Sequence, residues 1–303
     1  MRISTQSTYD RASAGMATLS AAAAKLQTQV ATGKKLIAPS DDAAAYRQLT
    51  VIRRANADQT ANAANVTLAS GLLASSDTAL ESIGNQLVQA RELAMQASNG
   101  TLTDSQKASI ATSLDAIVDD MLALANTTDS RGQPLFGGAT GAVAYTRAAD
   151  GAISFAGTGE PGAIPIGDGT SIHANDSGER IFAVNTPGGA SDIFRIVQEL
   201  AEAIRTGGDV SKDASSEALT TLQSAIEGVA DARASVGARA ARVELQQTLM
   251  TKSNTDRAAL RESVEDTDVT TAIADLQKTM TVLSATQASF TKLASLSLFD
   301  YLK

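Results

Sequence analysis

The sequence predicts a mainly α-helical protein with a β-rich insertion. Long heptad helices from both chain ends are expected to pair antiparallel as a rod, with a small β domain at the far tip. Three observations predict this fold. Apolar residues recur every seven positions in both halves of the 303-residue chain. Aromatic residues make up only 3%, and Ala, Leu, Val and Ile supply the apolar share, which favours long helices over a thick core. Four of the five prolines gather between residues 132 and 189.

The first expected helix covers residues 12–37, and its apolar residues form a thin heptad pattern. Pro39 is expected to end this helix at the preceding residue, because a proline disfavours the helical conformation just before it. Ser40 or Asp41 can then cap the next helix, with Asp42 in its first turn. The pattern consists of two lines, Met16, Ala23, Val30 and Ile37, and Leu19, Leu26 and Gly33.

The second expected helix runs from about 42 to 98 and ends at Asn99–Gly100. Thr103 and Gln106 have the spacing of a capping box that begins a third helix. One heptad position of the second helix is held over seven repeats by Ile52, Gln59, Val66, Leu73, Leu80, Leu87 and Ala94.

The segment from 132 to 189 is rich in glycine and is expected to be a small β-rich part. The stretches "GAISFAG" (151–157), "SIHAN" (171–175) and "ERIFAV" (179–184) alternate in polarity and are predicted to be strands.

Helices are expected again at 191–206, at about 213–256 and from about 268. The long one places Leu222, Val229, Val236, Val243 and Met250 on one line. The last one places Val269, Leu276, Leu283 and Phe290 on one line and Ile273 and Met280 on another. The stretch "SVEDTDV" (263–269) between them is interpreted as a capping segment.

The expected domains are 1–40 with 265–303 for assembly, 41–131 with 190–264 for the rod, and 132–189 for the β-rich outer part.

Composition excludes several classes of function. The net charge of −8 argues against nucleic acid as a partner, and the absence of an apolar run of 18 residues argues against a membrane span. There is no cysteine, and the single histidine, His173, cannot build a zinc site alone. The G-x-G-x-x-G match at 157–162 is interpreted as a hairpin turn, because no helix pattern follows it. We therefore expect no enzyme, catalytic residue, metal or cofactor.

Four stretches resemble the flagellin family in sequence and in order. They are "GKKLIAPSDDAAAYRQL" from Gly33, "RELAMQASNGTLT" from Arg91, "NTTDSRGQPLFGG" from Asn126 and "ASVGARAARVE" from Ala234. The resemblance covers roughly residues 1–140 and 215–303. The tail "FTKLASLSLFDYLK" (290–303) and the "LFGG" at 135–138 are similar to the family's hook-associated junction proteins.

The resemblance implies a structural subunit that joins the flagellar hook to the flagellin filament. The implied partners are identical copies in a ring, another hook-associated protein on the hook side, flagellin on the filament side and an export chaperone. The implied location is the extracellular flagellum, reached without a cleaved signal peptide, since residues 1–16 hold no continuous apolar stretch. The implied assembly interface consists of Met16, Leu19, Leu26, Val30, Leu276, Met280, Leu283, Phe290, Leu298, Phe299 and Tyr301.

Two other functions stay open at this point. The chain could be a flagellin, the filament-forming subunit itself. It could also be a surface protein with a ligand site in the β-rich part, although few aromatic residues lie there for sugar stacking: Tyr145, Phe155 and Phe182.

Overall fold

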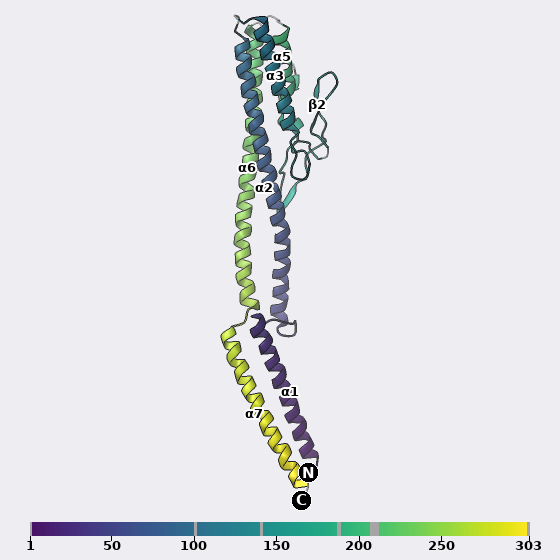
Figure 1. Cartoon of the computed structure of the whole chain (residues 1–303), viewed down its shortest axis with the longest axis vertical. Helices are drawn as coiled ribbons and strands as arrows, with labels where there is room; N and C mark the ends of the chain where they lie inside the picture. The colour runs from purple at the N-terminus through teal and green to yellow at the C-terminus, as the bar shows by residue number, and fades with distance from the viewer. Residues whose placement is uncertain (1, 100–101, 140–141, 187–188, 207–211, 302–303) are drawn as a thin grey trace. The chain divides into compact units, whose positions relative to one another are not determined.

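The computed structural model of the chain is dominated by long helices (Figure 1). It describes the backbone of residues 2–99, 102–139, 142–186, 189–206 and 212–301. It describes the side chains of these residues except 2–6, 212–216 and 293–301. Within these ranges the small β hairpins lie in an insertion between long helices, so the predicted fold class is confirmed.

The helices and strands follow one another in a simple order. The helices are α1 (Arg2–Thr32), α2 (Ala43–Ala97), α3 (Asp104–Ala125), α4 (Gly178–Ile181), α5 (Ile193–Arg205), α6 (Lys212–Glu265) and α7 (Val269–Tyr301). The strands are β1 (Tyr145–Arg147), β2 (Ile153–Phe155), β3 (Ile164–Gly167), β4 (Thr170–Ile172), β5 (Ala183–Thr186) and β6 (Gly189–Asp192). They pair antiparallel as β1–β2, β3–β4 and β5–β6.

The chain divides into two compact units, and α2 and α6 each contribute to both. The first unit contains residues 1–58 and 252–303, and the second contains residues 59–251. The division into three domains that the sequence suggests stays a prediction.

In the first unit, α1 and α7 pack against each other in opposite directions. At one end of the pair, Lys34 forms an antiparallel bridge with Asp266. Toward the other end, the rings of Tyr9 and Phe290 meet edge to face with centroids 5.3 Å apart. The ends of α1 and α7 therefore lie side by side (Figure 1).

The first connection, residues 33–42, differs from its prediction. Helix α1 ends at Thr32 rather than before Pro39, because the next residue, Gly33, has a φ of +70°, the left-handed conformation that commonly terminates helices. Asp42 rather than Ser40 or Asp41 caps α2, since its Oδ1 accepts hydrogen bonds from the backbone N–H groups of residues 44 and 45.

The second unit is held together by the two predicted heptad lines of α2 and α6, of which only Ile52 belongs to the first unit. All members of both lines are buried, from Ile52 to Ala94 on α2 and from Leu222 to Met250 on α6. The Nε2 of Gln59 donates a hydrogen bond to the carbonyl of Met250 at 2.6 Å. Farther along, Arg233 pairs with Asp77 at 3.0 Å. As one residue number rises the other falls, so α2 and α6 run antiparallel.

Helices α3 and α5 pack against each other in the second unit. The capping box of Thr103 and Gln106 is present at the start of α3, as predicted. Asp192 caps α5 by accepting hydrogen bonds from the backbone N–H groups of Phe194 and Arg195. The buried face of α5 carries Ile193, Phe194, Ile196, Val197, Leu200, Ala201 and Ile204.

The β-rich insertion packs beside α2 and α6. This differs from the position at the far tip of these helices that the sequence predicts. Asn65 of α2 donates a hydrogen bond to the carbonyl of Pro165 at 2.9 Å, and Arg239 of α6 donates one to the carbonyl of His173 at 2.8 Å. Both helical residues lie well away from the ends of α2 and α6. The physical reason is that the insertion shares its apolar core with the helices, since Tyr145 and Phe182 pack on Phe194 of α5.

Two local predictions in the insertion are wrong. Residues 157–162 do not form a hairpin turn but connect the β1–β2 and β3–β4 hairpins. There Thr158 forms a bridge with Gly138, whose φ of +76° and lack of a side chain allow the two backbones to meet. The stretch 179–184 is not a continuous strand, because α4 occupies its first residues and β5 begins at Ala183.

Candidate assembly surfaces

Most of the predicted assembly residues lie between α1 and α7 within one chain. Met16, Leu19, Leu26 and Val30 of α1 are partly buried, and Ala23 between them is 7% exposed. On α7, Leu276, Leu283 and Phe290 are partly buried in the same way. We call this contact the terminal helix pair. Its seam is thin, because these seven side chains are only partly buried.

Met280 does not belong to this seam. Its side chain is 51% exposed, and Ile273 and Val269 on neighbouring turns are 40% and 42% exposed. The second line of α7 that packs in the pair is formed by Ala272, which is buried, and by Thr279 and Thr286, which are partly buried. The heptad line of Ile273 and Met280 is therefore exposed in this chain, and the assignment of Met280 to an assembly interface stays a prediction.

Three predicted assembly residues, Leu298, Phe299 and Tyr301, lie outside the residues whose side chains the structure describes. Conversely, the sequence reasoning missed Tyr9, which contacts Phe290. The signal was present, since Tyr9 precedes Met16 by one heptad.

A network of ion pairs joins the connection between α1 and α2 to the connection between α6 and α7. We call it the connector network. It contains Lys34, Arg53, Arg261 and Glu265. Glu265 is 3% exposed, and its Oε1 accepts hydrogen bonds from Lys34 at 2.8 Å and from Arg53 at 3.1 Å. Its Oε2 lies 3.8 Å from Nε of Arg261.

Backbone hydrogen bonds join the same two connections. The N–H of Lys35 donates to the carbonyl of Glu265 at 2.8 Å, and the N–H of Thr267 donates to the carbonyl of Gly33 at 2.9 Å. Asp268 then caps α7 through the N–H groups of residues 270 and 271. The interpretation of 263–269 as a capping segment is correct for Asp268, but no local pattern indicates the long-range partners of Glu265.

Two carboxylates in this region are stabilised in their charged form. Hydrogen bonds to Asp41 from Lys25 and from the backbone N–H groups of Ala38 and Ile37 lower the pKa of Asp41 to about 2. Burial tends to raise the pKa of Glu265, but the hydrogen bond and charge of Lys34, together with Arg53, outweigh it and lower this pKa. The connection between α1 and α2 is therefore held by charge-assisted contacts.

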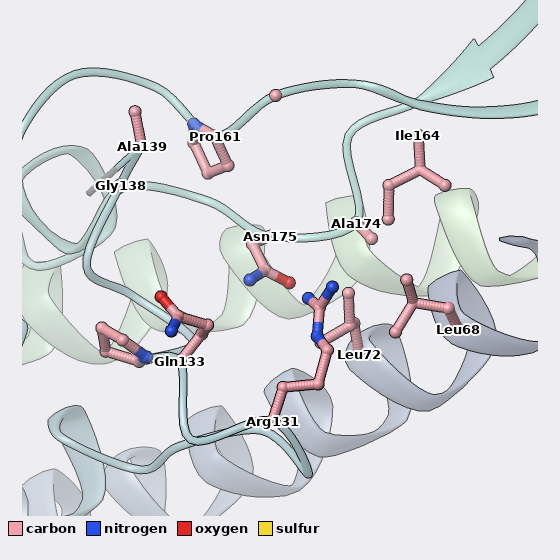
Figure 2. A pocket seen from close by; sticks show the side chains of 12 residues that line it. Leu68, Leu72, Arg131, Gln133, Gly138, Ala139, Pro161, Ile164, Ala174 and Asn175 are labelled. Atoms are coloured by element: carbon pink, nitrogen blue, oxygen red, sulfur yellow. The ribbon is translucent and has the colours of Figure 1, made fainter. Parts of the chain in front are cut away.

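A cavity of 260 Å³ lies in the second unit, between α2 and the insertion (Figure 2). Leu68 and Leu72 of α2 and Ile164 of β3 form apolar walls. Arg131, Gln133 and Asn175 bring polar side chains to it.

In the described ranges, no group of three or more His, Asp or Glu residues is placed to hold a metal ion. None of the helices traced in the structure is both long and apolar enough to cross a bilayer.

Comparisons with known proteins agree with this architecture. A family model for the bacterial flagellin N-terminal helical region matches residues 3–140. Flagellar hook-associated protein 3 of Salmonella typhimurium is 27% identical over an alignment of 317 residue positions, which covers 99% of each chain. Flagellin of Listeria monocytogenes is 24% identical over 83% of this chain and 81% of the flagellin.

A solved structure shares the fold. The crystal structure of flagellar hook associated protein-3 from Legionella pneumophila covers 71% of this chain and 98% of that protein, with 14% identity and a TM-score of 0.66. The order of the motifs, the long paired helices and these relatives lead to one conclusion. The chain is similar to the flagellin family in its N-terminal part and, over nearly its whole length, to a flagellar hook-associated protein.

Proposed function

We propose that this chain is a structural subunit of the bacterial flagellum that joins the hook to the flagellin filament. The observation that carries the proposal is the terminal helix pair, which leaves large apolar side chains of α7 exposed among the residues that the structure describes. Met280 is half exposed on α7, and Ile273 and Val269 continue the same face. The relationship to hook-associated proteins over 99% of the chain supports the flagellar setting.

The energetics of the terminal helix pair favour assembly with other chains. Ordering the backbone costs about 1–2 kcal/mol per residue. The partly buried seam, with alanine, glycine and threonine at several positions, returns little of that cost through burial of apolar area. Packing of further helices against the exposed face of α7 would supply the missing burial. Residues 1–40 and 265–303 are accordingly proposed as the assembly domain.

The proposed partners follow from the junction role. They are identical copies in a ring, another hook-associated protein on the hook side and flagellin on the filament side. An export chaperone would bind the chain before assembly, and export would proceed without a cleaved signal peptide. The function needs no catalytic step, cofactor, nucleic acid or membrane contact.

Flagellin, the filament-forming subunit, is the second candidate because a flagellin is also among the relatives. The hook-associated relative aligns with nearly the whole of both chains, whereas the flagellin aligns with 83% of this one.

Deletion of the gene separates the two roles. Loss of a junction protein leaves intact hooks and releases flagellin monomers into the medium. Loss of one flagellin removes or shortens the filament without that release.

Substitution of the exposed face of α7 tests the assembly surface. We expect Met280→Glu to leave the melting temperature of the monomer within about 2 °C of wild type, because the side chain is 51% exposed. The same variant should be depleted from hook preparations. Met95→Glu is the matched control, since Met95 is 45% exposed on α2 in the other unit. Equal recovery of both variants in hooks would refute the assembly role of Met280.

A further inference from the structure

The exposed large apolar side chains of the second unit are not scattered over its surface. Such side chains are exposed at five described positions of this unit, and four of them form one pair on α6 and one pair on α2. Leu245 and Leu249 of α6 are 60% and 52% exposed, and Val88 and Met95 of α2 are 41% and 45% exposed. Single exposed apolar residues are normal, whereas apolar side chains that gather on one helix face are typical of a contact surface.

Each apolar pair includes one charged residue on the same helix face. Arg242 precedes Leu245 by three residues, and Glu92 lies between Val88 and Met95 at helical spacing. Both charged residues are exposed, and neither forms an ion pair among the residues that the structure describes. The two surfaces are therefore alike in apolar content and opposite in charge. We call Arg242, Leu245 and Leu249 the α6 patch, and Val88, Glu92 and Met95 the α2 patch.

The α2 patch lies on the face of the helix pair that carries ion pairs between α2 and α6. Arg233 of α6 pairs with Asp77 at 3.0 Å and with Glu81 at 3.2 Å. Val88 follows Glu81 by seven residues and Met95 follows Val88 by seven more, so these three residues lie on one line of α2.

The α6 patch lies on the side of the β-rich insertion. Arg242 follows Arg239 by three residues and precedes Gln246 by four, and residues at these spacings are neighbours on a helix surface. Arg239 donates a hydrogen bond to the carbonyl of His173 at 2.8 Å, and the amide of Gln246 lies against Gly167. Arg242 therefore points toward the side on which the insertion packs.

These two sides of the helix pair point away from each other. Asn65 of α2 also contacts the insertion, through the carbonyl of Pro165. Because a helix turns by about 100° per residue, Asn65 and Glu81 point about 160° apart around α2. Gln59 lies opposite Met250, so the two patches are also separated by roughly 40 Å along the helices, at about 1.5 Å per residue. The patches therefore cannot contact each other within one chain.

A second copy of the chain supplies the complement to each patch. A two-fold interface uses the same surface on both copies, so patches on opposite sides cannot both belong to one such interface. Contact of the α6 patch of one copy with the α2 patch of the next is instead head-to-tail, and it leaves one patch free at each end for further copies. We propose that copies of this chain join in this way, with Arg242 of one copy paired to Glu92 of the next.

The inference rests on the proposed function only for its flagellar setting. There it gives identical copies a recognition surface outside the terminal helix pair. Opposite charges between two apolar surfaces favour this contact over contact of either patch with itself, which would bring like charges together.

Cysteine cross-linking tests the contact directly, because the chain contains no cysteine of its own. Leu245→Cys is combined in one full-length chain with Val88→Cys or with Met95→Cys, one for each direction in which the neighbouring copy can run. After oxidation of the concentrated, purified chain, we expect at least one combination to give a ladder of dimers, trimers and larger species on a non-reducing gel. Leu245→Cys alone, or with Ser113→Cys at an exposed position of α3, should stay largely monomeric. Absence of a ladder from both combinations, or equal dimer formation by Leu245→Cys alone, would overturn the proposal.

Charge reversal separates recognition from stability. Arg242→Glu and Glu92→Arg each place like charges at the contact and should reduce the ladder at least about tenfold. The two changes together restore opposite charges and should restore the ladder. Because both side chains are exposed, every variant should melt within about 2 °C of its parent. No recovery in the combined variant would contradict the pairing. These experiments use the purified chain, so their failure would leave the proposed junction role, which gene deletion tests, unaffected.

Discussion

Glu265 and Lys34 lie 231 residues apart in the chain, yet the Nζ of Lys34 donates a hydrogen bond to Oε1 of Glu265 at 2.8 Å. The carboxylate is 3% exposed, while the lysine side chain is 48% exposed. Arg53 donates to the same oxygen atom. This contact joins the connection after α1 to the end of α6, and with the Lys34–Asp266 bridge it makes both connections one local structure.

Neutralising Glu265 should loosen both connections together. We expect Glu265→Gln to cost roughly 1.5–3 kcal/mol of local stability, because hydrogen bonds to charged groups contribute about that amount. Hydrogen exchange should accelerate at Lys35 and at Thr267, whose N–H groups donate across the two connections. Glu262→Gln, at an exposed position on the same helix, is the control. Faster exchange on one connection only would show that they are not coupled.

The connection between α1 and α2 should also be sensitive to acid. The pKa of Asp41 is lowered from 3.8 to about 2 in the folded chain. Its stabilising effect is therefore fully present above about pH 4 and is lost as the pH falls through about 2. Asp41→Asn should reduce this acid-dependent loss in a circular dichroism titration, and Asp58→Asn, at an exposed position, should not. Identical acid titrations of wild type and Asp41→Asn would contradict the prediction.

The core of the second unit depends on the heptad lines of α2 and α6. Leu80 is fully buried, so Leu80→Ala should cost about 2–5 kcal/mol in a urea unfolding experiment. Val88→Ala on the same helix is the comparison, because Val88 is 41% exposed and its loss should cost under about 1 kcal/mol. Similar costs for both would mean that this face of α2 is not the core.

The insertion should contribute to the stability of the second unit. Phe182 is fully buried and packs edge to face on Phe136 and on Phe194 of α5, with centroids 5.3 and 6.0 Å apart. Phe182→Ala should cost about 3–5 kcal/mol. Replacing residues 140–186 by a short Gly-Ser linker should lower the melting temperature, because Phe194 would lose its aromatic neighbours. An unchanged melting curve of the linker variant would show that the helices are stable without the insertion.

The C-terminal tail should act in assembly. Removing residues 296–303 takes away Leu298, Phe299 and Tyr301, and burial of such side chains is worth about 1.5–3 kcal/mol each. We expect export of the shortened chain and an unchanged melting temperature of the monomer, but poor retention in hook preparations. A drop of several degrees in the monomer would mean that the tail packs within its own chain.

The sequence predicted the parts of the fold that depend on periodicity. Every member of the line from Ile52 to Ala94 is buried, because a seven-residue repeat places these side chains on one face of a helix whatever its partner is. The capping box at Thr103 was predictable for a similar reason, since its two residues interact locally.

The sequence was insufficient where the outcome depends on contacts between distant residues. Met280 fits a heptad line as well as Thr279 does, and only the packing of α1 decides which of them faces inward. The position of the insertion depends on Asn65 and Arg239, whose partners lie far away in the sequence. Glu265 and the cavity around Asn175 were missed because their chemistry is assembled from separate segments.

The hydrogen bond between Gln59 and Met250 limits how the length of the helices can change. A polar residue in an otherwise apolar line is satisfied in only one alignment of the two helices. Shortening one helix alone would shift every apolar residue beyond the deletion away from its neighbours. Only removal of seven residues from both helices at facing positions keeps Leu73 and Val236 in the interior. Longer or shorter versions of this protein are therefore expected to differ by matched pairs of heptads.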